Sequence, residues 1–320
     1  MTGMILDATR TARAKELRAR AEADLAAGAP DLLQRYPLQA YIDALDHHGR
    51  WHRFWDFTPT ARAQFNEMSA QFAAPIVETY HRLLLAHLIA HAEKRPGDIL
   101  PASVQPLVLE SFDRILSAME RPRGGYYSIE VHLYRRDLAI CRQKLIPCGS
   151  EVIDRNVRVG RNEVVRRGAV AVLRQMQAYR QDFFGPLWPV YECHWDRRLI
   201  RYFTPAEFTA SYRRAADMLK ANPKVLALIS GQTWWYDPAL RDLAPDMLFL
   251  REIPEAGGAR FIRSDVENKV VTSDALAFSP ERKALFEAGR YKPQVFSLVW
   301  RRRDLLAWAE RIGDSGADPC

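Results

Sequence analysis

Two copies of one short pattern, Glu-x-His-x-x-Arg-Arg, begin 62 residues apart, at positions 130 and 192. The first copy contains Glu130 and His132, and the second contains Glu192 and His194. Each copy follows aromatic and β-branched residues, which favour a strand, and side chains two positions apart on a strand project from the same face. We therefore predict that these four side chains are at least partly buried and meet in one pocket.

A carboxylate beside an imidazole suits two kinds of chemistry. The carboxylate can tune the imidazole as a general base, which would make the four residues catalytic in group transfer. Alternatively, both groups can bind a divalent metal such as iron, manganese or zinc, as in a non-haem iron oxygenase. The arginine pairs would then hold an anionic substrate or neutralise the carboxylates. The pattern also fits two polar hairpins with nothing bound, because short motifs match by chance.

A second group of candidate residues follows a long apolar run. It consists of Trp234, Trp235, Tyr236 and Asp237, directly before Pro238. Ligands of open α/β sheets bind beyond the carboxyl ends of strands, and loops of this kind lie there. We therefore predict that these four residues wall a substrate pocket, and the alternative is a hydrophobic plug between a strand and a helix.

The elements that must position these residues change in character along the chain. Residues 1–122 predict a helical region, and residues 123–320 predict an α/β region, with two related halves at 123–185 and 186–320 as one interpretation. Strands alternating with helices indicate an α/β (or α+β) fold with a mixed sheet and flanking helices. Strands are expected at 126–132, 138–145, 152–159, 190–195, 225–235, 260–263 and 295–300. The main helices are expected at 8–27, 59–93, 103–119, 162–184 and 204–221, and the second of these is one helix or two in tandem, divided at Pro75.

Composition limits the class of protein. The 320 residues are 48% hydrophobic and 27% charged, which is typical of a globular chain with room for two domains. An apolar run of roughly 18 residues is absent, so we expect no membrane span. The N-terminus lacks the apolar core of a secretory signal, and the four cysteines lack Cys-x-x-Cys spacing. These features predict a reduced, cytoplasmic protein without a zinc site or disulfide framework.

Positive charge is concentrated in residues 135–180, which hold eleven Arg or Lys against four acidic residues. Such an excess could meet a phosphate-bearing cofactor, a nucleic acid or an acidic partner, or it could be a solvated helix face. Nucleic acid is disfavoured, because few aromatic residues alternate with these cations and stacking platforms need them. A non-enzymatic binding module that uses this stretch is one alternative function.

A family resemblance occurs near the C-terminus, within residues 279–300. Its matching positions are Ala284, Leu285, Phe286, Glu287, Gly289 and Tyr291, ahead of the apolar run from Val295 to Trp300. This segment resembles the C-terminal part of the GCN5-related N-acetyltransferase fold, which often reads Ala-x-x-Leu-Tyr-Glu-x-x-Gly-Phe. Phe286 stands where many members have the Tyr that protonates the departing thiolate.

The resemblance implies an acetyltransferase-like region that binds acyl-CoA. The residues that would hold the cofactor's phosphates are Arg158, Gly160, Arg161, Arg166 and Arg167. The first functional hypothesis is therefore an acyl-CoA-dependent N-acyltransferase for a small molecule, with Glu192 or His194 deprotonating an amine. The alternatives are the metal-dependent enzyme and the binding module described above.

Overall fold

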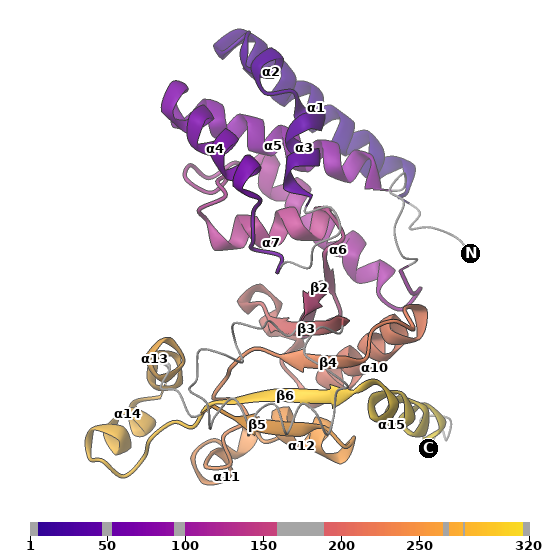
Figure 1. The fold of residues 1–320 in the computed structure, drawn as a ribbon, viewed down its shortest axis with the longest axis vertical. Helices are drawn as coiled ribbons and strands as arrows, with labels where there is room; N and C mark the ends of the chain where they lie inside the picture. Colours follow the sequence, from indigo (N-terminus) through magenta and orange to yellow (C-terminus); the bar gives the residue numbers. More distant parts are fainter. Residues whose placement is uncertain are drawn as a thin grey trace. The chain divides into compact units, whose positions relative to one another are not determined.

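The computed structural model describes residues 6–46, 53–92, 100–158, 189–264, 269–277 and 279–315. The chain divides into two compact units, Met1–Pro147 and Cys148–Cys320. The division falls after Pro147, whereas the sequence predicts the boundary between residues 122 and 123. Figure 1 shows the elements of both units, coloured along the sequence from indigo to yellow.

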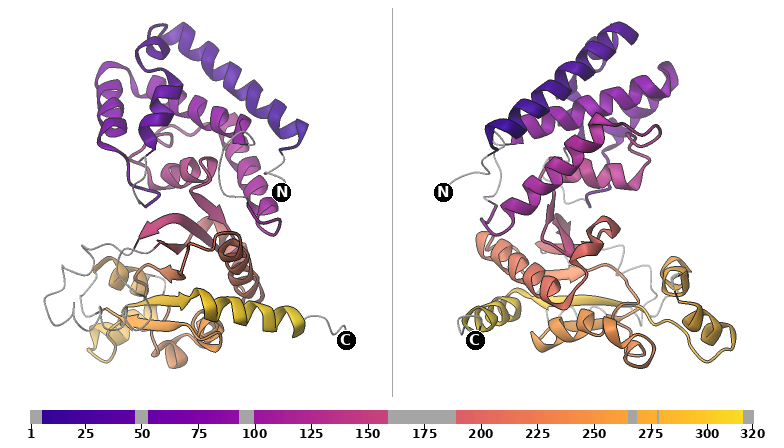
Figure 2. Two further views of the ribbon diagram at one scale, coloured as in Figure 1. Left: turned by 45° about the vertical axis from the view of Figure 1, so that its right-hand side comes forward. Right: turned by 180° about the vertical axis from the view of Figure 1, so that it is seen from behind.

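The first unit is built mainly from helices. They are α1 (Ala8–Gly28), α2 (Leu32–Arg35), α3 (Leu38–Leu45), α4 (Pro59–Gln71), α5 (Ala74–Ala90), α6 (Gln105–Glu120) and α7 (His132–Cys141), followed by the short strand β1 (Leu145–Pro147). Helix α1 packs along α5, and both views of Figure 2 show the two helices side by side. The buried face of α1 carries Ala14, Ala21 and Leu25. The small alanine side chains permit this close approach.

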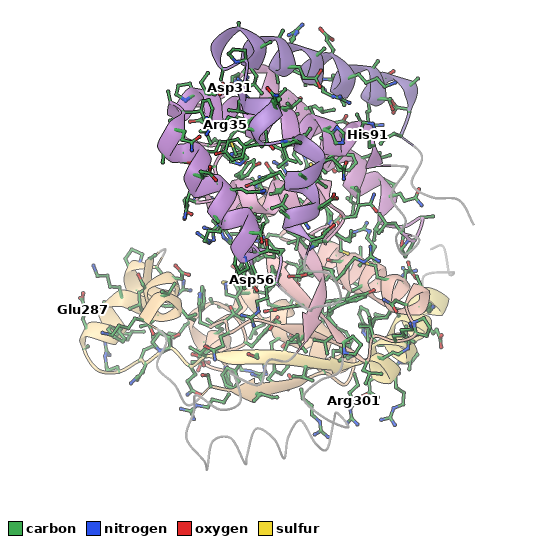
Figure 3. All side chains as sticks on the ribbon, turned by 45° about the horizontal axis from the view of Figure 1, so that its top comes forward. Asp31, Arg35, Asp56, His91, Glu287 and Arg301 are labelled. Carbon is green, nitrogen blue, oxygen red and sulfur yellow. The ribbon has the colours of Figure 1, made fainter. Side chains whose placement is uncertain are left out.

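Helix starts in this unit follow the capping signals of the sequence. Thr58 precedes Pro59, and the Thr58 hydroxyl accepts a hydrogen bond from the Ala61 amide at 2.9 Å. Pro75 stands in the first turn of α5, where a missing N–H costs little. On the surface, Arg35 and Asp31 lie one turn apart at 3.5 Å (Figure 3). Both side chains are largely exposed, so this pair contributes at most about 1 kcal/mol.

The strands expected at 126–132 and 138–145 are wrong. Residues 122–131 form turns, and residues 132–141 form α7. Tyr134, Leu138 and Cys141 are spaced four and three residues apart, and all three are buried. This is the period of a helix with one apolar face. The aromatic and β-branched residues before it fill the core from a loop, so their strand propensity is overridden by packing.

The second unit contains a mixed sheet with helices around it. Its strands are β2 (Glu151–Arg158), β3 (Pro189–Trp195), β4 (Ala227–Ser230), β5 (Arg260–Arg263) and β6 (Phe296–Arg301). Its helices are the 3-10 helices η2 (Arg197–Tyr202) and η3 (Pro245–Met247) and the α-helices α10 (Pro205–Ala221), α11 (Leu240–Leu243), α12 (Phe249–Ala256), α13 (Lys269–Ala277), α14 (Pro280–Glu287) and α15 (Arg302–Ser315). The strand order is β2-β3-β4-β6-β5 (Figure 1). The chain is therefore of mixed α/β class, as predicted.

Within this sheet β3 and β4 are parallel, whereas β2/β3, β4/β6 and β5/β6 are antiparallel. A parallel connection needs a crossover, and α10 supplies it. The helix begins as the sequence predicts, because the Thr204 hydroxyl accepts a hydrogen bond from the Glu207 amide at 3.2 Å. Since α10 returns the chain to the start of β4, its N-terminus lies toward the carboxyl end of β3.

The two faces of the sheet carry different cores. One face holds Val190, Ala227, Ile229 and Val299. The other carries a group of aromatic rings in which Trp300 contacts Tyr212 from α10 and Trp308 from α15 at 5.3 and 4.9 Å between ring centroids. Trp300 is fully buried, and its indole N–H donates to the Gly257 carbonyl at 2.9 Å.

We expect Gly257→Ala to destabilise the second unit by about 1–3 kcal/mol, the usual cost of overpacking. A Cβ at position 257 would stand 2.1 Å from Cζ2 of Trp300, so the indole or the backbone must move. The measurement is urea unfolding followed by tryptophan fluorescence. Gly124→Ala is the matched control, because a Cβ there meets nothing within 4 Å. Equal unfolding midpoints for the two variants would contradict the expectation.

Candidate functional site

The first copy of the repeated pattern lies on the surface of the helical unit. Glu130 is exposed in a turn and binds the guanidinium groups of Arg62 and Arg135 at 2.9 and 3.3 Å. His132 is exposed at the start of α7, where its Nε2 lies 3.1 Å from the donating Nε of Arg136. The predicted burial is therefore wrong for this copy. Its residue types are explained by surface ion pairs and a helix start.

The second copy lies on β3, as predicted, and is mostly buried. Glu192 is 2% exposed, and its Oε2 lies 4.0 Å from Nε2 of His194. Asp154 on β2 stands opposite Glu192 in the ladder and is fully buried. Paired residues project from the same face, so Asp154, Glu192 and His194 share one face of the sheet. We name these three residues the β3 acidic cluster.

The two copies of the pattern thus have different structures, one a turn and helix start and the other a strand. The shared spacing does not orient their side chains alike, because a helix and a strand have different periods. The repeat therefore gives no structural basis for one symmetric site. Only the second copy places its Glu and His together within a sheet.

The parallel strands β3 and β4 pair over three residues and then separate. The last pair in register is Cys193 with Ser230. Beyond it, His194 and Trp195 continue to pair with β2, whereas Thr233 pairs with Phe296 at the start of β6. The two chains therefore follow different neighbours, and their pairing ends at the carboxyl ends of the parallel strands. We call this feature the β3–β4 opening.

A β-bulge accompanies the opening. Three residues lie between Ile229 and Thr233, but only two lie between their partners Val299 and Phe296, so the β4 side carries one extra residue. Ser230 supports this geometry, because its hydroxyl accepts from the Leu298 amide and donates to the Gly231 carbonyl, both at 2.9 Å. A Cβ added at Gly231 would stand 3.4 Å from Oε1 of Glu192. The β3 acidic cluster therefore borders the opening.

A second buried carboxyl lies on the opposite face of β2. Glu151 is 4% exposed and hydrogen-bonds the thiol of Cys193, which projects from the same face. Burial raises the pKa of Glu151 to about 7 and raises the pKa of Cys193 well above its ordinary value. Oε2 of Glu151 is buried without a hydrogen-bond partner among the described residues. Glu151 therefore titrates near neutral pH inside the core, next to the last β3–β4 pair.

Aromatic rings gather where both parallel strands end. Trp195 contacts Trp235 and Phe203 at 5.2 and 6.3 Å between ring centroids, and Phe203 contacts Trp235 and Phe249 at 5.6 and 5.7 Å. All of these contacts are edge-to-face. We name these four residues, each only partly buried, the aromatic cluster.

Of the four residues predicted to wall a pocket, only Trp235 belongs to the aromatic cluster. Trp234 is buried with Leu240 and Ala275. Asp237 is buried, and its oxygens accept from the amides of Ala239 and Gln294 at 3.0 and 2.9 Å. Tyr236 is 2% exposed. The plug interpretation therefore describes Trp234, Tyr236 and Asp237, which fix the loop, while Trp235 lies at the opening.

The predicted phosphate-binding segment lies mostly outside the described residues. Gly160, Arg161, Arg166 and Arg167 fall in that part of the chain, and so does the helix expected at 162–184. The backbone of Arg158 ends β2 and pairs with Pro189. The acetyltransferase-like segment forms α14 and the following turn, and Glu287 lies at its exposed end (Figure 3). These positions leave acyl-CoA binding as a prediction.

Two residues of this region, Glu151 and Phe203, are not among the candidates predicted from the sequence. Glu151 opens a strand that was predicted correctly, yet alternation alone does not say which face meets the core. Phe203 precedes the capping box of α10, the position from which a hydrophobic residue often fixes a helix start. Both faces of β3 therefore carry candidate residues, whereas the repeated pattern predicts candidates on one face only.

Three of the four cysteines lie within the described residues. Cys141, Cys148 and Cys193 are buried free thiols. Among the described residues, no group of three His, Cys, Asp or Glu side chains has metal-binding geometry. No helix in the described ranges is long and apolar enough to cross a bilayer. No family model, curated protein or solved structure matches the chain.

Proposed function

We propose that the protein is an acyltransferase that moves an acyl group from coenzyme A to an amine of a small molecule. The observation that carries this proposal is the β3–β4 opening, with the β3 acidic cluster on one face and the aromatic cluster on the other. An opening at the carboxyl ends of parallel strands is where α/β sheets bind ligands. The separated strand edges suit an extended chain with amide groups, because such chains add to sheets as strands do. The pantetheine arm of coenzyme A is a chain of this kind.

The residues at the opening can supply the proton transfer that the reaction needs. An amine must lose a proton to attack a thioester carbonyl, and the departing thiolate must gain one. We assign the first step to His194, the more exposed member of the Glu192–His194 pair, with side-chain exposures of 11% and 3%. The Glu192 carboxylate, 4.0 Å away, stabilises the imidazolium that forms. The imidazolium then gives this proton to the departing thiolate as the carbon–sulfur bond breaks, so His194 acts as base and then as acid and Glu192 has a supporting role.

Two features favour a phosphate-bearing donor. The N-terminus of α10 lies toward the carboxyl end of β3, and helix N-termini attract anions through free amides and the helix dipole. The positive charge of residues 135–180 is the second feature, and five of its eleven Arg or Lys residues lie outside the described residues. In the described part, Arg135 and Arg142 already bind Glu130 and Asp46. The binding-module alternative therefore has less support from the described cations.

The test is calorimetry of the full chain with coenzyme A and with acetyl-coenzyme A. We expect one molecule to bind per chain at ligand concentrations up to about 1 mM, a range that covers weak affinities. Absence of binding for both ligands would remove the proposal.

A variant separates binding at the opening from binding elsewhere. Gly231→Val places a branched side chain beside Oε1 of Glu192, where a Cβ already stands at 3.4 Å. We expect this variant to lose coenzyme A binding. Gly124→Val, whose Cβ meets nothing within 4 Å, should bind as the wild type does. Unchanged binding by Gly231→Val, with its circular dichroism intact, would place the cofactor away from the opening.

A further inference from the structure

We propose that the acyl group transferred at this site is a medium-length alkyl chain, and that the aromatic cluster holds it. This inference rests on the proposed acyl transfer and adds the chemical class of the donor. Three observations support it. The aromatic cluster lies beside the opening, its rings are partly exposed, and it contains an indole N–H without a hydrogen-bond acceptor among the described residues.

The place of the cluster relates it directly to the opening. Trp195 follows Cys193, the last β3 residue paired with β4, by two positions. Trp235 follows Thr233, which pairs with β6, also by two positions. The two indole rings nevertheless meet at 5.2 Å between centroids and 72° between planes. They therefore bridge the strands at the side of the opening, where the end of an inserted thioester would arrive.

The exposure of the cluster is that of a binding surface rather than a core. Its four rings are partly exposed, while Phe208 and Tyr212 beneath them are each 1% exposed. Among the described residues, two large hydrophobic side chains are strongly exposed, Ile200 at 62% and Val270 at 69%. Contiguous exposed apolar surface is unfavourable in water and commonly marks a binding site.

Each exposed aliphatic side chain lies close in sequence to a residue of this region. Ile200 lies in η2, three residues before Phe203 of the cluster. Val270 precedes Val271 in α13, and Val271 packs with Trp235 against the same buried residues. An alkyl chain that lies across the cluster would cover this surface. An acetyl group, which has one methyl, would leave nearly all of it in water.

A polar atom within the cluster suits the thioester itself. The indole Nε1 of Trp195 is buried and has no hydrogen-bond partner among the described residues. A buried donor without an acceptor is costly, so a ligand that offers an acceptor is favoured there. A thioester carbonyl offers an acceptor oxygen and no donor. Trp195 can therefore bind the carbonyl while its ring and its neighbours bind the chain.

The experiment compares coenzyme A, acetyl-coenzyme A and octanoyl-coenzyme A by calorimetry on the full chain. Each buried methylene strengthens binding by roughly fourfold. We therefore expect octanoyl-coenzyme A to bind at least about tenfold more tightly than acetyl-coenzyme A, which requires burial of only about two of its six extra carbons. Equal affinities for the two thioesters would overturn the inference and leave the proposed acyl transfer standing.

Variants locate the preference in the cluster. Trp235→Ala should abolish the preference for octanoyl-coenzyme A over acetyl-coenzyme A, measured as the ratio of their two affinities. Phe72→Ala, which removes a half-buried ring in the helical unit, should keep the preference. If Trp235→Ala fails to fold, Ile200→Ser at an exposed position replaces it and should reduce the preference. A preference that survives in the folded variants would overturn the inference.

A shorter thioester separates this inference from the proposed function. S-octanoyl-N-acetylcysteamine carries the chain and the thioester without the nucleotide. Binding to the wild type but not to Trp235→Ala would support the apolar site, even if coenzyme A itself did not bind. Absence of binding by both octanoyl compounds would overturn the inference.

Discussion

Replacement of His194 by Gln should lower the rate of amine-dependent thiol release by about 10²–10⁴-fold, the usual contribution of a positioned general base. Glutamine keeps a polar side chain of similar length but cannot accept the proton of an ammonium group. Stability should change little, because His194 is partly exposed at the end of β3. The measurement is release of coenzyme A from an acyl donor, with and without a panel of small amines.

The chain offers a matched control for this variant. His132→Gln changes the histidine of the first copy of the pattern, which is exposed on the helical unit and accepts a hydrogen bond from Arg136. We expect it to retain wild-type activity and stability. Equal losses in the two variants would mean that both copies contribute to one site, as the sequence pattern first suggested. A full rate in His194→Gln would remove the imidazole from the proposed proton transfer.

The fold was predictable where local signals and tertiary packing agree. Thr58 and Thr204 stand before prolines at helix starts, and both cap their helices as expected. The strand expected at 260–263 has those bounds in the structure. In each case the local signal of the sequence and the element in the structure coincide. Agreement between these levels is what makes a segment predictable.

The errors occur where burial and propensity disagree. Tyr126, Tyr127 and Ile129 favour a strand, yet they belong to turns before α7. Helix α12, which was not predicted, contains Pro254 and ends at Gly257, both of which are typical helix breakers. Leu250 and Pro254 are nevertheless buried four residues apart on one face. Packing against the rest of the second unit therefore offsets an unfavourable local sequence.

The candidate site was half predictable for a related reason. The spacing of Glu192 and His194 predicts that both side chains project from one face of the strand, because side chains of a strand alternate between its two faces. The β3–β4 opening could not be derived, since it depends on which strands are neighbours and on one extra residue in β4. The same holds for the aromatic cluster, whose members come from η2, β3, α12 and the loop after β4. Pairing between distant segments is not encoded in any local pattern.

The buried carboxyl of Glu151 makes the pH dependence of stability a sharp test of the second unit. Burial raises its pKa from 4.5 to about 7 in the folded chain. The folded state therefore holds this proton more tightly than the unfolded state does. Its contribution to stability is fully present below pH 4.5 and is lost progressively as the pH rises to about 7. One pKa unit corresponds to about 1.4 kcal/mol, so the loss is about 3 kcal/mol.

Glutamine at this position removes the ionisation and keeps the shape of the protonated side chain. We therefore expect Glu151→Gln to match the wild type in stability near pH 4.5 and to exceed it by about 3 kcal/mol near pH 8. The measurement is urea unfolding of both proteins across this range. Their difference cancels the other titrating groups. A constant difference for Glu151→Gln across this range would mean that the Glu151 carboxyl is hydrated or paired in solution, and that water reaches its side of the β3–β4 opening.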